Sequence, residues 1–185
     1  ANETYLGVTD DDFKANPNTR YAATRNDLIS TYASRGYLRH FVELGGNASL
    51  KTTAYFTNFH RNWFKLDKVN GKSAYKEWND PAFLAVVKGQ AAGELRNKAN
   101  NRDYSSKGIE SVLTYDLALG SLDNQIKFGV RYHEDDIDRL QWYQYYTQDA
   151  NGGLSTTGPD APSGKAGDRH QSTEAWSVYI EDRIT

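Results

Sequence analysis

The chain from Ile109 to Tyr132 alternates apolar and polar residues with period two on both sides of a short turn. This pattern predicts a β-hairpin with one apolar and one polar face. We centre the predicted turn on Ser121 and Leu122, which sets the antiparallel register. The expected pairs are Leu117 with Ile126, Tyr115 with Phe128 and Leu113 with Val130 on the apolar face, and Asp116 with Lys127 on the polar face.

An earlier stretch, residues 37–59, repeats the design around a turn between Gly45 and Ala48. It also predicts one apolar face and one polar face, with His40 on the apolar phase. Residues 173–185 begin a further strand that has Trp176, Val178 and Ile180 on one face. The expected pairs of the earlier hairpin are Leu44 with Leu50, Val42 with Thr52, Leu38 with Phe56, and Glu43 with Lys51 on the polar face.

The connections between these strands are of two kinds. The hairpin turns are only a few residues long, whereas residues 66–104 and 147–172 form gaps longer than compact domains normally contain. In the first gap, Asp80 and Pro81 are a good N-cap and first-turn pair, and they predict a helix within residues 82–98. The second gap is rich in Gly, Ser, Thr and Pro and predicts a loop. Residues 1–30 also predict a loop, with a small capped turn at Thr9.

The predicted strands are long. Residues 125–146 contain no obvious strand breaker apart from Gly129, whereas a strand crosses a bilayer in about 9–11 residues. The apolar phase ends at Tyr132 and charged residues follow at once, so the surplus is expected to extend beyond the hydrocarbon. Because the smallest membrane barrels have about eight strands, the sequence predicts an all-β fragment, about five strands of an antiparallel up-and-down transmembrane β-barrel.

The amino-acid composition excludes several classes of function and structure. The 185 residues include no cysteine, 13 tyrosines, 7 phenylalanines and 4 tryptophans, with a net charge of -2 and a mean hydropathy of -0.79. Thiolate chemistry is excluded, and the balanced charge argues against a nucleic-acid partner. No apolar run is long enough for a membrane helix. Many amphipathic rings in a polar chain suit an interface or an outer-membrane barrel.

An acidic cluster, Phe128–Arg139, is the first candidate for chemistry. Strict alternation places His133 and Asp135 on one face and puts Glu134, Asp136 and Asp138 on the other. A single metal ion would need these ligands together, so we favour a solvated strand extension, partly paired with Arg131 and Arg139, over a divalent-ion site. Nothing nearby offers a nucleophile or an oxyanion pocket. We therefore predict no catalytic residue, no metal ligand and no enzyme activity.

Four stretches, residues 2–23, 52–67, 128–142 and 172–184, resemble the barrel region of TonB-dependent outer-membrane receptors. They are most similar to receptors of the ferric-dicitrate or siderophore type. The resemblance implies a plugged barrel of about 22 strands in the bacterial outer membrane. It also implies that the whole receptor imports a ferric chelate with energy from TonB. Residues 1–185 would then be part of the barrel domain, without the plug, its TonB box and most strands.

The resemblance also implies partners. These are the ferric chelate, outer-membrane lipid and lipopolysaccharide, and the TonB–ExbB–ExbD system through the missing plug. Iron would be cargo within the chelate, and no resident cofactor is implied. Which chelate is carried stays open.

A ferric chelate such as ferric citrate is an anion rich in carboxylates, and arginine forks bind carboxylates bidentately. Arg61, Trp63 and Lys65 continue the polar phase of the second strand toward its long-loop end. Arg20 and Arg25 lie in the loop before the first strand. We predict these five residues as the substrate-binding set. The alternative is that they are rim charges that meet solvent, lipopolysaccharide or neighbouring acids.

A second interpretation is a soluble all-β ligand-binding or glycan-binding module, which would also use many strands and exposed aromatic residues. The one-sided loop lengths favour the barrel, because a sandwich needs no such asymmetry. The polar charge pairs that both hairpins keep on one face favour it too.

Overall fold

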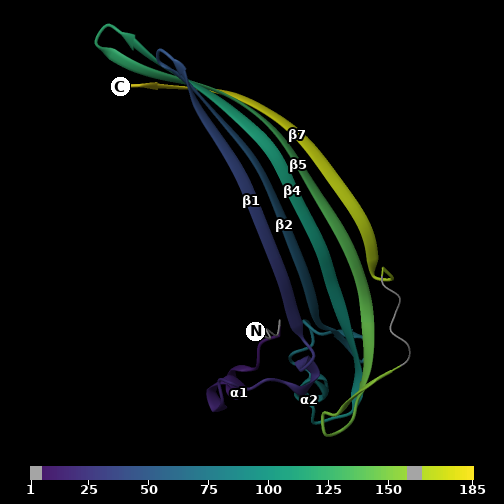
Figure 1. Cartoon of the computed structure of the whole chain (residues 1–185). Coiled ribbons are helices and arrows are strands. Elements are labelled where there is room, and N and C mark those ends of the chain that lie inside the picture. The colour runs from purple at the N-terminus through teal and green to yellow at the C-terminus, as the bar shows by residue number, and fades with distance from the viewer. Residues whose placement is uncertain (1–5, 158–163) are drawn as a thin grey trace. The chain divides into compact units, whose positions relative to one another are not determined.

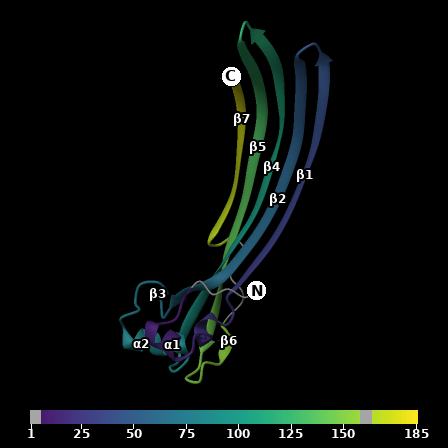
Figure 2. The same cartoon turned by 90° about the vertical axis from the view of Figure 1, so that its left-hand side faces the viewer.

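The computed structural model describes residues 6–157 and 164–185. Residues 1–5 of the predicted opening loop and residues 158–163 of the predicted second gap lie outside this part. The chain folds mainly as an antiparallel β-sheet of five long strands, which lie side by side (Figure 1). The same strands are seen from a second direction in Figure 2. The long strands are β1 (Leu28–Gly45), β2 (Ala48–Val69), β4 (Gly93–Leu119), β5 (Leu122–Gln148) and β7 (Gly167–Ile184).

The strand order confirms the predicted up-and-down arrangement. The order is β1-β2-β4-β5, and β7 pairs with β5. Two short strands, β3 (Lys72–Ser73) and β6 (Leu154–Thr156), pair with β2 and β5 respectively. The helical elements are α1 (Asp10–Ala15), the 3-10 turn η1 (Ala22–Thr24) and α2 (Pro81–Lys88). Among the described residues, no helix has the length and apolar character needed to cross a membrane.

The chain divides into two compact units. The first, which we call the loop unit, is the described part of residues 1–31, 60–102 and 139–169. The second, the sheet unit, comprises residues 32–59, 103–138 and 170–185.

The β4–β5 hairpin corrects the predicted register. The two strands are joined by Gly120 and Ser121, and Gly120 has φ +67°. The predicted turn lay one residue further along. Glycine reaches positive φ without a Cβ clash, so the chain turns there. A turn one residue earlier moves the pairing by two positions, and the predicted pair of Leu117 with Ile126 is wrong. Each side chain nevertheless keeps its face, because the alternation has period two.

The charges near this turn also have other partners than those predicted. The Gln125 amide donates a hydrogen bond to Asp116 at 2.9 Å. Lys127 Nζ lies 2.9 Å from Glu181 Oε1 on β7. The predicted pair of Asp116 with Lys127 is therefore wrong, because Lys127 has a closer acid on a strand that the hairpin pattern cannot reveal.

The β1–β2 hairpin turns at Gly46 and Asn47, inside the predicted interval. A Cβ built on Gly36 would lie 2.3 Å from the ring of Phe56. The ring therefore fills the space above the glycine, and the predicted pair of Leu38 with Phe56 is wrong by two positions.

The hydrogen bond from Arg39 Nε to Thr53 Oγ1, at 3.4 Å, fits this shifted register. It places Arg39 on the polar face, so His40 lies on the apolar face as predicted. No ion pair joins Glu43 to Lys51 within residues 6–157 and 164–185.

One face of the sheet unit is apolar and exposed. Trp176 is 73% exposed and Ile180 is 75% exposed, and the Trp176 ring packs on Tyr132 with centroids 5.0 Å apart. An apolar surface of this extent requires a partner or a lipid environment. The large exposed residues of this face are Leu38, Leu44, Phe56, Ile109, Leu113, Tyr115, Phe128, Trp176, Val178 and Ile180.

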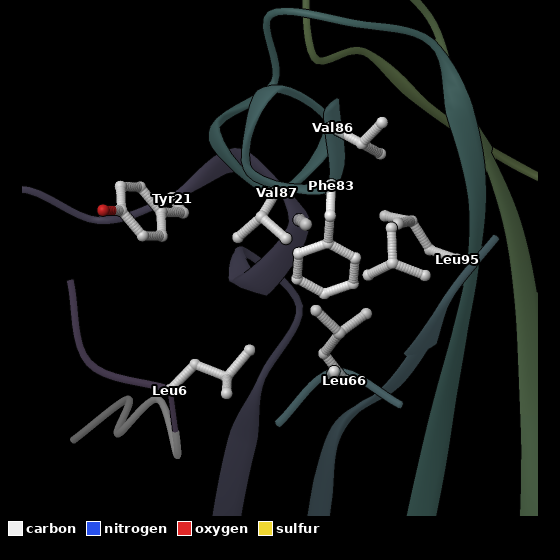
Figure 3. Close-up of a cluster of buried hydrophobic side chains, with 10 residues drawn as sticks. Leu6, Tyr21, Leu66, Phe83, Val86, Val87 and Leu95 are labelled. Atoms are coloured by element: carbon white, nitrogen blue, oxygen red, sulfur yellow. The ribbon is translucent and has the colours of Figure 1, made fainter. Parts of the chain in front are cut away.

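The loop unit has a buried core of its own (Figure 3). Phe83, Val86 and Val87 project from α2 into this core. They pack with side chains from the ends of β2 and β4 and from the first segment of the chain. These partners are Leu6, Tyr21, Ala23, Leu66, Val69, Ala74 and Leu95.

Helix α2 begins as predicted and ends earlier than predicted. The Asp80 side chain accepts hydrogen bonds from the amides of Ala82, at 2.9 Å, and Phe83, at 3.3 Å. Gly89 ends the helix in the left-handed conformation, with φ +84°. The predicted helical stretch reached residue 98, but β4 begins at Gly93. The gap between β2 and β4 is thus shorter than the sequence predicted.

Residues 6–31 are more ordered than the predicted loop. Thr9 caps α1 as expected. The Asp12 carboxylate accepts hydrogen bonds from Tyr21, at 2.5 Å, and Thr9, at 2.8 Å, and it pairs with Lys88 of α2 at 2.9 Å. These contacts, with Lys88 the largest cause, lower the pKa of Asp12 to about 2. Asp12 therefore connects the first segment of the chain to α2.

Candidate functional site

The polar face of the loop unit carries positive side chains on β2, β4 and β5. Arg96 of β4 pairs with Asp67 of β2, with its Nε 2.9 Å from Asp67 Oδ2. In the sheet unit, Phe59 packs on Tyr104 with ring centroids 5.8 Å apart. Both contacts belong to one β2–β4 register. We infer from this register that Lys65 lies beside Lys98 and that Arg61 lies beside Arg102.

Strand β5 adds side chains beside those of β2 and β4 on the same face of the sheet. Gln141 of β5 is hydrogen-bonded to Asn100 of β4, and the Asp116–Gln125 bond of the hairpin follows the same register. Two residues from the Asn100–Gln141 pair on each strand, the same register places Arg102 beside Arg139. Three adjacent strands thus present one row of arginines, which we call the arginine row: Arg61, Arg102 and Arg139.

Aromatic rings hold the lysine beside the arginine row. Lys65 Nζ lies 4.4 Å from the ring centroid of Trp63 and 5.1 Å from that of Tyr75. Burial is the main cause that lowers the pKa of Lys65, with Asp67 acting in the opposite direction and Lys98 adding to the shift. Aromatic rings stabilise cations on their faces, so Trp63 and Tyr75 help to hold the Lys65 ammonium at this position.

The ring of Tyr143 contacts two cationic side chains of β4. The Arg96 guanidinium lies 4.1 Å from the ring centroid of Tyr143, and Lys98 Nζ lies 5.8 Å from the same centroid. Together with the arginine row, these side chains form a surface with many cations, and its carboxylate Asp67 is paired with Arg96. We call it the cationic surface: Arg61, Trp63, Lys65, Asp67, Arg96, Lys98, Arg102, Arg139 and Tyr143.

Buried guanidinium donors of the arginine row lack a hydrogen-bond acceptor among the described residues. The Nε atoms of Arg61 and Arg139 are buried and have no hydrogen-bond partner among the described residues. The terminal Nη2 of Arg139 donates to the Gln141 side chain at 2.6 Å. Because an unsatisfied buried donor is costly, these arginines have unused capacity for an acceptor. Arginine is also the side chain best shaped for carboxylates.

The structure brings together Arg61, Trp63 and Lys65, three of the five predicted residues. The other two contact the backbone of their own loop. Arg20 donates to the carbonyls of Thr24, at 2.6 Å, and Asp27, at 3.1 Å. Arg25 Nε donates to the carbonyl of Ala22 at 3.2 Å. Their part in ligand binding stays a prediction.

Sequence reasoning missed the contributions of β4 and β5. Residues 93–104 were predicted as part of a loop, so the alternation of Arg96, Lys98 and Arg102 was not used as a signal. Their period of two marks them as one face of a strand. Arg139 was assigned to the acidic cluster and lies instead in the arginine row.

The acidic cluster is divided between the faces as predicted, but its partners differ. Glu134 pairs with Lys107 at 2.9 Å, and Asp138 contacts His170 at 2.8 Å. The predicted pairing of the acids with Arg131 and Arg139 is not found among the described residues. Within residues 6–157 and 164–185, no group of three or more His, Cys, Asp or Glu side chains is arranged so that it could hold a metal ion.

No protein-family model matches the chain, and no curated protein sequence matches it. A solved structure does match: the crystal structure of the ferric citrate transporter FecA in the unliganded form. The TM-score is 0.66 and the sequence identity is 17%. The similarity covers 97% of this chain and 22% of that chain, so this chain spans about a fifth of the FecA chain. The fold is therefore that of an antiparallel β-barrel fragment, similar to the matching part of the FecA structure.

Proposed function

We propose that this chain is part of the barrel domain of a TonB-dependent outer-membrane receptor that imports an anionic ferric chelate. On this proposal, residues 1–185 supply barrel strands and external loops, and a plug and further strands belong to the rest of the receptor. The whole barrel carries out the transport. The chain itself has no catalytic role in this proposal.

The apolar face of the sheet unit supports the location. Its exposed Trp176, Val178 and Ile180 alternate with polar residues along β7, as on the lipid side of a barrel strand. The packed rings of Tyr132 and Trp176 suit the aromatic belt at a membrane interface. Charged side chains follow beyond Tyr132 on β5, where lipopolysaccharide and water would lie.

The cationic surface is the observation that carries the substrate class. It combines the arginine row with Lys65 and Lys98, and its carboxylate Asp67 is already paired with Arg96. Such a surface attracts a ligand with several negative charges and repels cations. Citrate complexes of ferric iron fit this description, and so do other carboxylate-rich siderophores. Iron arrives within the chelate, as cargo and not as a cofactor of this chain.

Coupling to TonB, ExbB and ExbD would pass through the plug. Nothing in this chain has to contact them directly for the proposal to hold. The role of the chain is to supply wall and loop residues that recognise the chelate.

The proposal is tested with the full-length gene product in detergent micelles. Arg61 and Arg139 are replaced by glutamine, singly and together, because glutamine keeps much of the length and removes the charge. Ferric citrate binding is measured by calorimetry. We expect a loss of about tenfold for each variant, since charge-assisted bonds are the strong ones. A neutral ferric hydroxamate serves as the comparison ligand.

Arg39→Gln is the matched control, because Arg39 is also on the polar face but belongs to β1, bonds to Thr53 and is not part of the cationic surface. Equal losses in R39Q, R61Q and R139Q would contradict a specific surface and leave only general electrostatics. Unchanged citrate binding in the double variant would refute the proposed role. A full-length product that is a soluble monomer without detergent would instead support a soluble binding module.

A further inference from the structure

The polar face of the sheet unit contains a second site with different chemistry. A depression of about 340 Å³ lies among β2, β4, β5 and β7, which is within the usual range for ligand pockets. Its lining includes Thr57, Phe59, Ser106, Asp135 and Gln171. None of its described lining residues is Lys, Arg or His. An anion would find no positive partner there, in contrast to the cationic surface.

The lining offers hydroxyl, amide and carboxylate groups beside a pair of rings. Phe59 and Tyr104 pack with centroids 5.8 Å apart and form one wall. Hydroxyl and amide side chains both donate and accept hydrogen bonds, whereas an ionised carboxylate only accepts them. Rings bind apolar C–H surfaces. A molecule that presents many hydroxyls on one side and C–H groups on the other therefore matches this lining.

Asp135 is held in position by a chain of hydrogen bonds. Arg131 Nε donates to the Tyr55 hydroxyl at 2.9 Å, and that hydroxyl lies 2.7 Å from His133 Nδ1. His133 Nε2 lies 2.8 Å from Asp135 Oδ2. The arginine side chain has no acceptor atom, so the Tyr55 hydroxyl accepts a hydrogen bond from Arg131 and donates its own O–H to His133 Nδ1. His133 Nε2 then donates to Asp135. One oxygen of Asp135 is engaged, and Oδ1 accepts no hydrogen bond among the described residues.

Gly108 makes this chain of hydrogen bonds possible. Tyr55 is on β2 and His133 is on β5, so the tyrosine must cross β4 to reach the histidine. A Cβ on Gly108 would lie 2.4 Å from the Tyr55 hydroxyl oxygen and 2.6 Å from the carbonyl oxygen of Tyr132. Only glycine leaves room for the ring at this point. The position of Asp135 thus depends on residues from three strands.

We propose that this depression binds an uncharged polyhydroxylated ring, as in a saccharide, with Asp135 Oδ1 accepting ligand hydroxyls. Gln171, Thr57 and Ser106 supply further hydrogen bonds, and the Phe59–Tyr104 pair packs against the C–H face of the ring. The saccharide is either free or part of a larger molecule such as lipopolysaccharide. The proposal is independent of chelate import, because it uses none of the residues of the cationic surface.

The test uses the full-length gene product in detergent micelles. Maltose and purified lipopolysaccharide core oligosaccharide are the two probes, titrated by calorimetry. The variants are Asp135→Asn and Gln171→Leu, and far-UV circular dichroism checks that each retains its β-structure. We expect at least one probe to bind, and each variant to weaken that binding by about tenfold. Binding of maltose indicates a free sugar as ligand, and binding of only the oligosaccharide indicates lipopolysaccharide.

Asp138→Asn is the matched control. Asp138 lies on the same strand, on the opposite face, and contacts His170 instead of the depression. Saccharide binding in D138N should equal that of the unaltered protein. The proposal is overturned if neither probe binds, if D135N and Q171L bind as tightly as the unaltered protein, or if D138N loses as much affinity as D135N. Ferric citrate binding, measured separately, should not change in D135N.

Discussion

The core of the loop unit gives a quantitative prediction for Phe83→Ala. Phe83 is 5% exposed and packs against the cluster of α2 and the strand ends. Truncating a buried phenylalanine costs about 3–5 kcal/mol, because apolar burial is lost and a cavity remains. We expect this cost to appear as easier opening of the loop unit. At about 1.4 kcal/mol per factor of ten, amides of α2 should exchange at least about 100-fold faster.

Hydrogen exchange with mass spectrometry on the full-length gene product measures this effect. Phe13→Ala is the matched control, since it makes the same substitution in α1 at a side chain that is 54% exposed. F13A should leave α2 exchange within about threefold of the unaltered protein, because surface changes usually cost under about 0.5 kcal/mol. Equal acceleration in both variants would refute the reasoning. So would an F83A protein whose α2 exchanges at the original rate.

Two further predictions concern the loop unit. The pKa of Asp12 is lowered to about 2, so its contacts with Lys88 and Tyr21 stabilise the folded state above its usual pKa. This contribution is lost as the pH falls through about 2. The protection factors of α1 amides, which correct for the pH dependence of the intrinsic exchange rate, should therefore fall between pH 4 and pH 2. Asp12→Asn should remove that dependence, and an unchanged profile would contradict it. Asp80→Ala removes the N-cap of α2, which should cost about 1 kcal/mol. Denaturant unfolding followed at Trp78 measures it, and an unchanged midpoint would speak against the cap.

Several features of the fold were predictable because they depend on neighbouring residues. The alternation of Phe128, Val130 and Tyr132 with polar residues assigned the faces of β5. Asp80 and Pro81 identified the start of α2 through the chemistry of a helix N-terminus. The end of α2 was predictable in principle from Gly89, whose backbone adopts the left-handed conformation. The prediction missed it because the apolar pattern continues past the glycine.

The candidate site was less predictable. Arg61, Trp63 and Lys65 were found because they continue a recognised strand. Their neighbours on β4 and β5 were missed, because the face of residues 93–104 opposite Arg96 mixes the apolar Leu95 and Ala99 with Asn and Asp residues. The apolar phase by which a strand is recognised is therefore interrupted. The chain of hydrogen bonds that leads to Asp135 could not be predicted from the sequence either, because it joins Tyr55 to a histidine 78 residues away in sequence.

The sequence by itself determined the class of fold, the faces of the strand segments that alternate with period two, and the positions of the two hairpin turns to within a residue. These depend on period-two alternation and on glycines, both of which are local. Only the tertiary structure decided the register, the partner of Lys127 and the assembly of the arginine row. Register is set by backbone hydrogen bonds between strands, and a shift of two residues leaves every apolar side chain on its face. Alternation therefore cannot distinguish one such register from the next, whereas side-chain contacts across the sheet can.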